Sequence, residues 1–193
     1  QYGLIEEPVE GDEFLFTSTV LAVNDSGTAV GHSSNYYKET RNDERRILTR
    51  QSAIFYNGEV IDITNDEDYV LQSNNELMSA AVDVNNSNIA VGYSKKTING
   101  NARTKFYYYD IEAQNLVFPE DFFPGSSSKA KAINNNGLIV GDAEIDTELN
   151  TTRRRHAFIY DINEGSFTDL NTLLECNSPY TIVEANGIND AGQ

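Results

Sequence analysis

The sequence has little cysteine, little positive charge and no long apolar run. Its 193 residues include one cysteine, Cys176, which excludes an internal disulfide and a metal cluster held by cysteines. Against 30 acidic residues stand 14 lysines and arginines, and the formal net charge of −16 argues against nucleic acid or an anionic lipid surface as partner. Because no apolar stretch reaches the ~18 residues of a membrane helix, we expect this segment not to be integral to a membrane.

What the sequence has instead is aromatic residues in a polar, acidic background. Aromatic residues make up 10% of the chain, as 11 tyrosines and 9 phenylalanines. A disordered acidic chain carries far fewer aromatic side chains, so the composition predicts a folded protein with a sizeable core.

A turn motif recurs four times along the chain. Each copy begins with an Asn that follows a short apolar stretch, and these residues, 61, 49 and 55 positions apart, are Asn24, Asn85, Asn134 and Asn189. Glycines complete the copies at Gly27, Gly31, Gly92, Gly137, Gly141 and Gly192, and Asn88 takes the place of the turn glycine in the second copy. Because Asn, Asp and Gly tolerate positive φ, the motif predicts a tight hairpin turn followed by a strand.

A second motif, an aromatic strand, alternates with the first. Its tyrosines are 53 and 51 residues apart, at Tyr56, Tyr109 and Tyr160. In the third copy it reads His156-Ala157-Phe158-Ile159-Tyr160-Asp161. The two motifs share one period of roughly fifty residues, so they belong to one repeating unit.

Each unit reads as four short strands joined by turns, which predicts an all-β fold of repeated antiparallel meanders. Blades of a β-propeller are the simplest arrangement of such units; a β-sandwich and an open array of sheets are the alternatives. We treat residues 1–193 as a single β-repeat domain or a fragment of one, with units at about 19–70, 78–125 and 128–175 and an incomplete unit at 182–193, or about three and a half units in all. Residues 71–81 form the one weak helix candidate.

The literal His156-Ala157-Phe158 and the repeated Asn-turn motif resemble the bacterial extracellular HAF-repeat proteins. They are also similar to a related family of exported Gram-negative surface proteins of unknown function. The resemblance runs from about Thr19 to Gln193, and its motifs are structural. It implies export, repeat architecture and no known catalytic residues.

The sharpest charged pattern is four alternating carboxylates, Asp142, Glu144, Asp146 and Glu148. On a strand they share one face and could bind Ca²⁺, which prefers oxygen ligands. The alternative is that Arg153, Arg154 and Arg155 lie on the returning strand and neutralise that face. A second acidic cluster, Asp62, Asp66 and Asp68, lacks the glycine and closing glutamate of an EF-hand and is interpreted as a solvated loop.

The sequence gives little indication of a catalytic or cofactor-binding site. The two histidines, His32 and His156, occupy different places in different units, which argues against a shared metal or acid–base site. No Gly-x-Ser-x-Gly elbow or phosphate-binding glycine loop is present, so we expect no enzyme and no cofactor apart from the candidate Ca²⁺. The run Tyr107-Tyr108-Tyr109 must face both sides of its strand; the second face contacts either a neighbouring unit or sugar rings.

These observations favour an exported, non-catalytic module that binds a protein or carbohydrate partner, or serves a structural role, in the periplasm, at the cell surface or outside the cell. Unpaired blade edges could also support self-association. The alternatives are a calcium-dependent adhesion or assembly module and part of a propeller enzyme acting on polysaccharide. The chain opens on Gln1 without an initiator Met and breaks off inside its fourth turn motif, so we expect a removed export signal and a longer parent protein.

Overall fold

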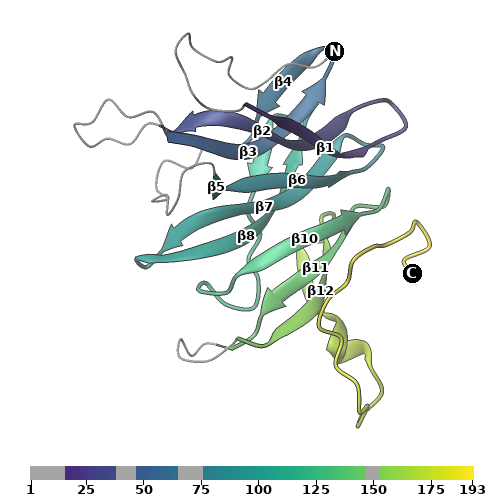
Figure 1. Ribbon diagram of the computed structural model, residues 1–193. Helices are drawn as coiled ribbons and strands as arrows, with labels where there is room; N and C mark the ends of the chain where they lie inside the picture. Colours follow the sequence, from purple (N-terminus) through teal and green to yellow (C-terminus); the bar gives the residue numbers. More distant parts are fainter. Residues whose placement is uncertain (1–15, 38–46, 65–75, 147–152) are drawn as a thin grey trace.

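The computed structural model describes residues 16–37, 47–64, 76–146 and 153–193 (Figure 1). Within these ranges the chain forms three sheets built from consecutive antiparallel strands, with one short 3₁₀ helix, η1 (Leu170–Leu173), after the last strand. The prediction of an all-β fold of repeated four-stranded meanders is confirmed at this level. No closed barrel is seen among the described residues, so the arrangement of the sheets as propeller blades stays a prediction.

The three sheets follow one another along the chain, each in simple strand order. The first contains β1 (Ser18–Val23), β2 (Ala29–Tyr37), β3 (Ile47–Tyr56), β4 (Glu59–Asp62) and a two-residue strand β5 (Glu76–Leu77) that pairs in parallel with β3. The second contains β6 (Ser79–Val84), β7 (Ile89–Ile98), β8 (Asn101–Asp110) and β9 (Asn115–Val117). The third contains β10 (Ser128–Ile133), β11 (Leu138–Glu144), β12 (Arg155–Asp161) and β13 (Ser166–Asp169).

The weak helix candidate at residues 71–81 is wrong where the structure describes it. Residues 76–77 and 79–81 belong to β5 and β6, and the rest of the candidate lies outside the described residues. Ala80 and Ala81 favour helices locally, but both are buried where β6 packs against the first sheet. Tertiary burial and pairing with β7 therefore override helix propensity.

The tight turns occur where the repeated motif predicts them. The fourth residue of the motif has positive φ in every copy, at Gly27 (86°), Asn88 (57°), Gly137 (81°) and Gly192 (78°). Asn88 replaces glycine without changing the turn, because Asn is among the few side chains that adopt this backbone conformation.

The second glycine of the first three copies is required for a different reason: two strands approach each other closely at this position. The first strand of every sheet has a register shift, and Gly31, Gly92 and Gly141 lie opposite it. A Cβ atom on Gly92 would lie 2.0 Å from the carbonyl oxygen of Ala80 and 2.7 Å from the hydroxyl of Tyr107. The equivalent distances to backbone oxygen are 1.8 Å at Gly31 and 2.0 Å at Gly141, so each bulge requires glycine.

Two core clusters lie between consecutive sheets, and a third, made of Ala29, Ala53 and Phe55, belongs to the first sheet alone. Strand β6 contacts β1, β2 and β3, and β10 contacts β6, β7 and β8, so the first strands of the second and third sheets pack on the preceding sheet. Between the second and third sheets, the ring centroids of Phe106 and Phe158 are 4.7 Å apart, and Tyr108 stacks on Tyr160 at 6.3 Å. The second face of the Tyr107–Tyr109 strand thus contacts the neighbouring unit.

Replacing Gly92 with alanine should lower the free energy of unfolding by about 1–3 kcal/mol, because the added methyl group meets backbone that cannot move without breaking strand pairing. Chemical denaturation monitored by far-ultraviolet circular dichroism measures this. Gly187→Ala is the matched control, since its Cβ would enter open space. Equal stability of the two variants would contradict the close-approach explanation.

Candidate functional site

The most regular polar feature of the molecule is a ladder of asparagine side chains that joins one turn to the next. The Nδ2 of Asn24 donates to the carbonyl oxygen of Asn85 at 2.9 Å. Asn85 donates in the same way to Asn134 at 3.1 Å, and Asn134 to Asn189 at 3.0 Å. We name these four residues the asparagine ladder.

The other end of each ladder side chain holds its own turn. Oδ1 of Asn85 accepts from the backbone N–H groups of Ser87 and Ile89, both at 3.0 Å. Oδ1 of Asn134 accepts in the same way from Asn136 and Leu138 at 3.1 and 2.9 Å. One buried amide therefore fixes the turn and reaches the next unit at once, because its acceptor oxygen and its donor N–H groups are on separate atoms that point in different directions.

A second, exposed row of contacts runs beside the ladder, one residue further on. The backbone N–H of Asp25 donates to Asn86 Oδ1 at 3.1 Å, and that of Asn86 to Asn135 Oδ1 at 2.8 Å. The backbone N–H of Asn135 donates to Asp190 Oδ1 at 2.9 Å. Each turn thus gives two N–H donors to the turn that follows, so the contacts have a fixed direction along the chain.

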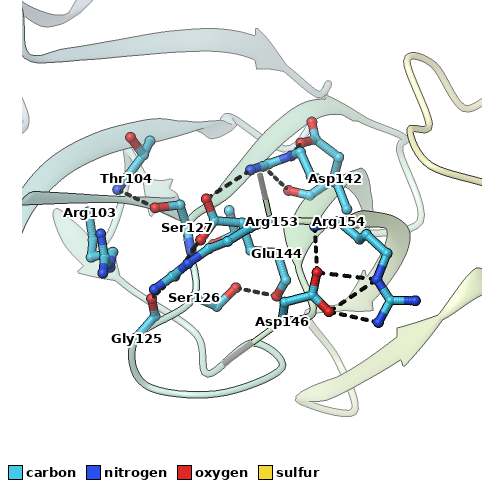
Figure 2. Close-up of polar contacts among 12 residues, drawn as sticks. Arg103, Thr104, Gly125, Ser126, Ser127, Asp142, Glu144, Asp146, Arg153 and Arg154 are labelled. Atoms are coloured by element: carbon cyan, nitrogen blue, oxygen red, sulfur yellow. Dashed lines mark hydrogen bonds and ion pairs between the residues drawn. The ribbon is translucent and has the colours of Figure 1, made fainter. Parts of the chain in front are cut away.

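Arginines contact the three carboxylates of the acidic pattern that the structure describes, Asp142, Glu144 and Asp146 (Figure 2). Arg153 Nη1 lies 2.6 Å from Glu144 Oε2, and Arg154 Nη2 lies 2.7 Å from Asp146 Oδ1. Arg155 forms an ion pair with Asp142, which is buried, with 6% of the residue exposed.

This arrangement matches the ion-pair alternative for the three carboxylates that the structure describes. The hydrogen bonds from Arg154 hold the pKa of Asp146 below its ordinary value. Glu148 lies outside the described residues, as do Asp66 and Asp68 of the second acidic cluster. Across the described ranges, no three His, Cys, Asp or Glu side chains are placed to hold a metal ion. The calcium site at Asp142–Glu148 stays a prediction.

The two histidines lie in different environments and serve different local roles. His156 Nδ1 is 2.7 Å from Asp169 Oδ2, between β12 and β13. His32, in β2, is buried, and its Nδ1 has no hydrogen-bond partner among the described residues. Burial, with the positive charge of Arg50, lowers the pKa of His32 below its ordinary value of 6.5.

The remaining residues of the aromatic motif are structural in position. Phe158, Tyr109 and Tyr160 are buried between sheets. Tyr56 packs at the edge of the first core, and its hydroxyl donates to Glu112 of the second unit at 3.0 Å. Burial raises the pKa of Tyr109 and of Tyr160 above the ordinary value of 10.0, so neither hydroxyl is acidic near neutral pH.

One buried charged group was missed by sequence reasoning. Lys105 Nζ contacts both carboxylate oxygens of Asp121, at 2.9 and 2.7 Å, and the Ser128 hydroxyl donates to Asp121 at 2.6 Å. Only 1% of the Asp121 side chain is exposed. Lys105 and Asp121 occur in a single unit, so no repeat pattern marked them, and their pairing ties the second sheet to the start of the third.

Asn85→Ala should lower the free energy of unfolding by about 1–3 kcal/mol, because two partly buried hydrogen bonds from backbone N–H groups lose their acceptor and the next turn loses a donor. Thermal unfolding followed by circular dichroism measures the change. Ser87→Ala, at an exposed position in the same turn, should change it by no more than about 0.5 kcal/mol. An Asn85→Ala variant as stable as Ser87→Ala would refute the ladder's structural role.

The lowered pKa of His32 makes stability depend on pH near neutrality. The unfolded chain binds a proton to this residue more readily than the folded chain does. The contribution of neutral His32 to the free energy of unfolding is therefore complete above the unfolded pKa of 6.5 and is lost as pH falls toward the folded pKa. The melting temperature should therefore fall between about pH 7 and about pH 5 in the unmodified protein and fall less in His32→Gln. Parallel pH profiles of the two proteins would contradict this assignment.

Comparison with known proteins identifies a family whose function is unknown. A family model described as "Protein of unknown function (DUF3466)" matches residues 1–193. No curated protein and no solved structure matches the chain. None of the helices in the described ranges has the length and apolar character needed to cross a membrane.

Proposed function

The chain belongs to the DUF3466 family of proteins of unknown function, and we propose that it is a non-catalytic repeat module, exported to the periplasm, the cell surface or the medium. The proposal rests on the roles of the residues that repeat from unit to unit. The ladder asparagines hold a turn and reach the next unit, and the bulge glycines permit strand contact. The residues that define the repeat therefore serve assembly, and the variable side chains around them are left to bind a partner.

The charge distribution supports the same function. The acidic groups of the third sheet are paired with arginines, and the buried Asp121 is paired with Lys105. Paired carboxylates of this kind stabilise local structure and are not poised to transfer protons. The net charge of −16 keeps such a module soluble and limits nonspecific association outside the cell.

We further propose that the sheets are blades of a propeller-like array. Two features support it: the first strands of the second and third sheets pack on the preceding sheet, and each turn contacts the next through the same pair of donors. A repeated contact of constant direction generates a constant rotation from sheet to sheet.

Protease treatment of intact cells tests the export part of this proposal. The whole protein is expressed in the bacterium that encodes it and detected with an antibody raised against the purified 193-residue chain. We expect the antigen in the medium, in the periplasmic fraction or on the cell surface, where added protease removes it. Antigen confined to the cytoplasmic fraction, with a cytoplasmic marker protein as control, would overturn the proposal.

Turnover assays on the purified chain test the non-catalytic part. Mixed polysaccharides and a peptide library are incubated with the chain, and new reducing ends or new amino groups are measured. We expect no release above buffer. Release of product that disappears when a carboxylate on the third sheet is substituted, as in Glu144→Gln, would contradict the proposal and indicate that the chain is an enzyme.

A further inference from the structure

The third sheet carries two positive charges at positions where the first strands of the other sheets are neutral. Lys129 and Lys131 lie two residues apart on β10, and both are half-buried between buried neighbours. The equivalent residues, counted back from the ladder asparagine of each unit, are Thr19 and Leu21 on β1 and Ala80 and Val82 on β6. The repeated fold therefore does not require these two lysines.

A third positive charge and an aromatic ring lie beside the two lysines. Lys131 Nζ is 4.0 Å from Oδ1 of Asp142 on β11, and Asp142 also pairs with Arg155 of β12. Lys129 Nζ is 4.8 Å from the ring centroid of Tyr93, which belongs to β7 of the second sheet. We name Lys129, Lys131 and Arg155 the cationic cluster.

The positive charges of the cationic cluster repel one another. Burial lowers the pKa of Lys129, and the neighbouring charge of Lys131 lowers it further. Asp142 acts in the opposite direction, with a smaller effect than that of Lys131, and the charges of Arg155 and Lys95 add to the lowering. The carboxylate of Asp142 thus leaves the positive potential at Lys129 incompletely neutralised.

Lys129 itself forms no ion pair with any described residue. The Tyr93 ring presents only the partial negative charge of its face, which attracts an ammonium group more weakly than a carboxylate does. A half-buried ammonium group without a carboxylate partner costs free energy, and an anion that binds to it removes part of that cost. The arrangement of the cationic cluster therefore favours an anion as ligand.

We propose that the cationic cluster binds a small oxyanion, which is a phosphate, a sulfate or the carboxylate of an acidic sugar. The ammonium groups of Lys129 and Lys131 donate to the oxyanion, and Arg155 contributes positive potential. This inference deepens the proposed function and rests on it, since it assigns a class of ligand to the variable side chains of one unit.

The overall charge of the chain restricts the ligand to a small anion. A net charge of −16 repels an extended polyanion, such as nucleic acid, along its whole length. A single oxyanion responds mainly to the charges nearest to it, because the Debye length at physiological ionic strength is ~8 Å. A locally positive cluster therefore binds a small anion even in a strongly acidic protein.

Glu184 competes with an external anion for one of the ammonium groups. Its Oε1 is 2.8 Å from Lys131 Nζ, and its side chain is 41% exposed, whereas that of Asp142 is 9% exposed. The hydrogen bond from Lys131 holds the pKa of Glu184 below its ordinary value. The cluster thus already accepts one exposed carboxylate, and removal of Glu184 should free Lys131 for another.

NMR titration of the isotope-labelled chain with inorganic phosphate, at constant ionic strength, tests the proposal. We expect saturable shifts of backbone amide signals in β10 and around Arg155 and Tyr93. Lys129→Gln should weaken phosphate binding ~10-fold, since it removes a charge-assisted hydrogen bond. Lys96→Gln is the matched control and should leave the affinity unchanged. Lys96 also lies over an aromatic ring, that of Phe118 at 3.8 Å, but on the opposite face of β7 from Tyr93.

Separate titrations with sulfate and with glucuronate distinguish the sources of the oxyanion. Tighter binding of glucuronate at the cationic cluster assigns the site to the acid group of a sugar. Tighter binding of phosphate or sulfate assigns it to an inorganic or esterified anion.

A gain-of-binding variant keeps the test independent of any loss of folding. Glu184→Gln should strengthen phosphate binding ~3-fold, because an exposed ion pair of modest strength no longer competes for Lys131. The amide spectra establish that every variant folds.

Absence of saturable shifts with all three anions, or equal weakening of phosphate binding by Lys129→Gln and Lys96→Gln, would overturn the proposal. Either result would leave the export and turnover experiments unchanged. Antigen confined to the cytoplasm would overturn the proposed function without altering phosphate binding by the purified chain, so the two failures are distinguishable.

Discussion

The contact between consecutive turns through the asparagine ladder is the constraint on which the arrangement of the sheets depends. Three ladder residues, Asn24, Asn85 and Asn134, each reach the next turn through Nδ2, at 2.9 to 3.1 Å. Because the amide also accepts from its own turn, each turn and its contact with the neighbour form together. Buried amides are costly when left unpaired, so this geometry admits few alternative placements of one sheet on the next.

The bulge glycines supply the second half of this constraint. A carbonyl oxygen about 2 Å from the place of a Cβ atom means that the first two strands of each sheet approach more closely than side chains allow. The register shift of each first strand lies at this approach, and in the second and third sheets the same strand packs on the preceding sheet. Turn, bulge and packing between sheets are thus three aspects of one repeated structure, and they explain why the sequence repeats at these positions and varies between them.

The regular pattern breaks where single units carry their own polar groups. Asp121 and Lys105 form a buried pair in the second unit, and the three arginines before and at the start of β12 pair with carboxylates of the third. A buried pair of this kind adds little net stability relative to apolar residues, but removal of one partner is costly. The Lys105–Asp121 pair joins the second sheet to the start of the third, whereas the arginine pairs lie within the third sheet.

The amino-acid sequence by itself determined the repeat, the strands, the positive-φ turns and the residues that the turns require. These are local properties, because hairpin turns depend on the φ preferences of Asn and Gly and strands on the spacing of apolar side chains. Only the tertiary structure decided that residues 76–77 and 79–81 are strands, that the ladder reaches across units 49 to 61 residues apart, and that the bulge glycines lie under a carbonyl oxygen. These contacts join residues distant in the chain, and their identity follows from packing between sheets, which no local pattern encodes.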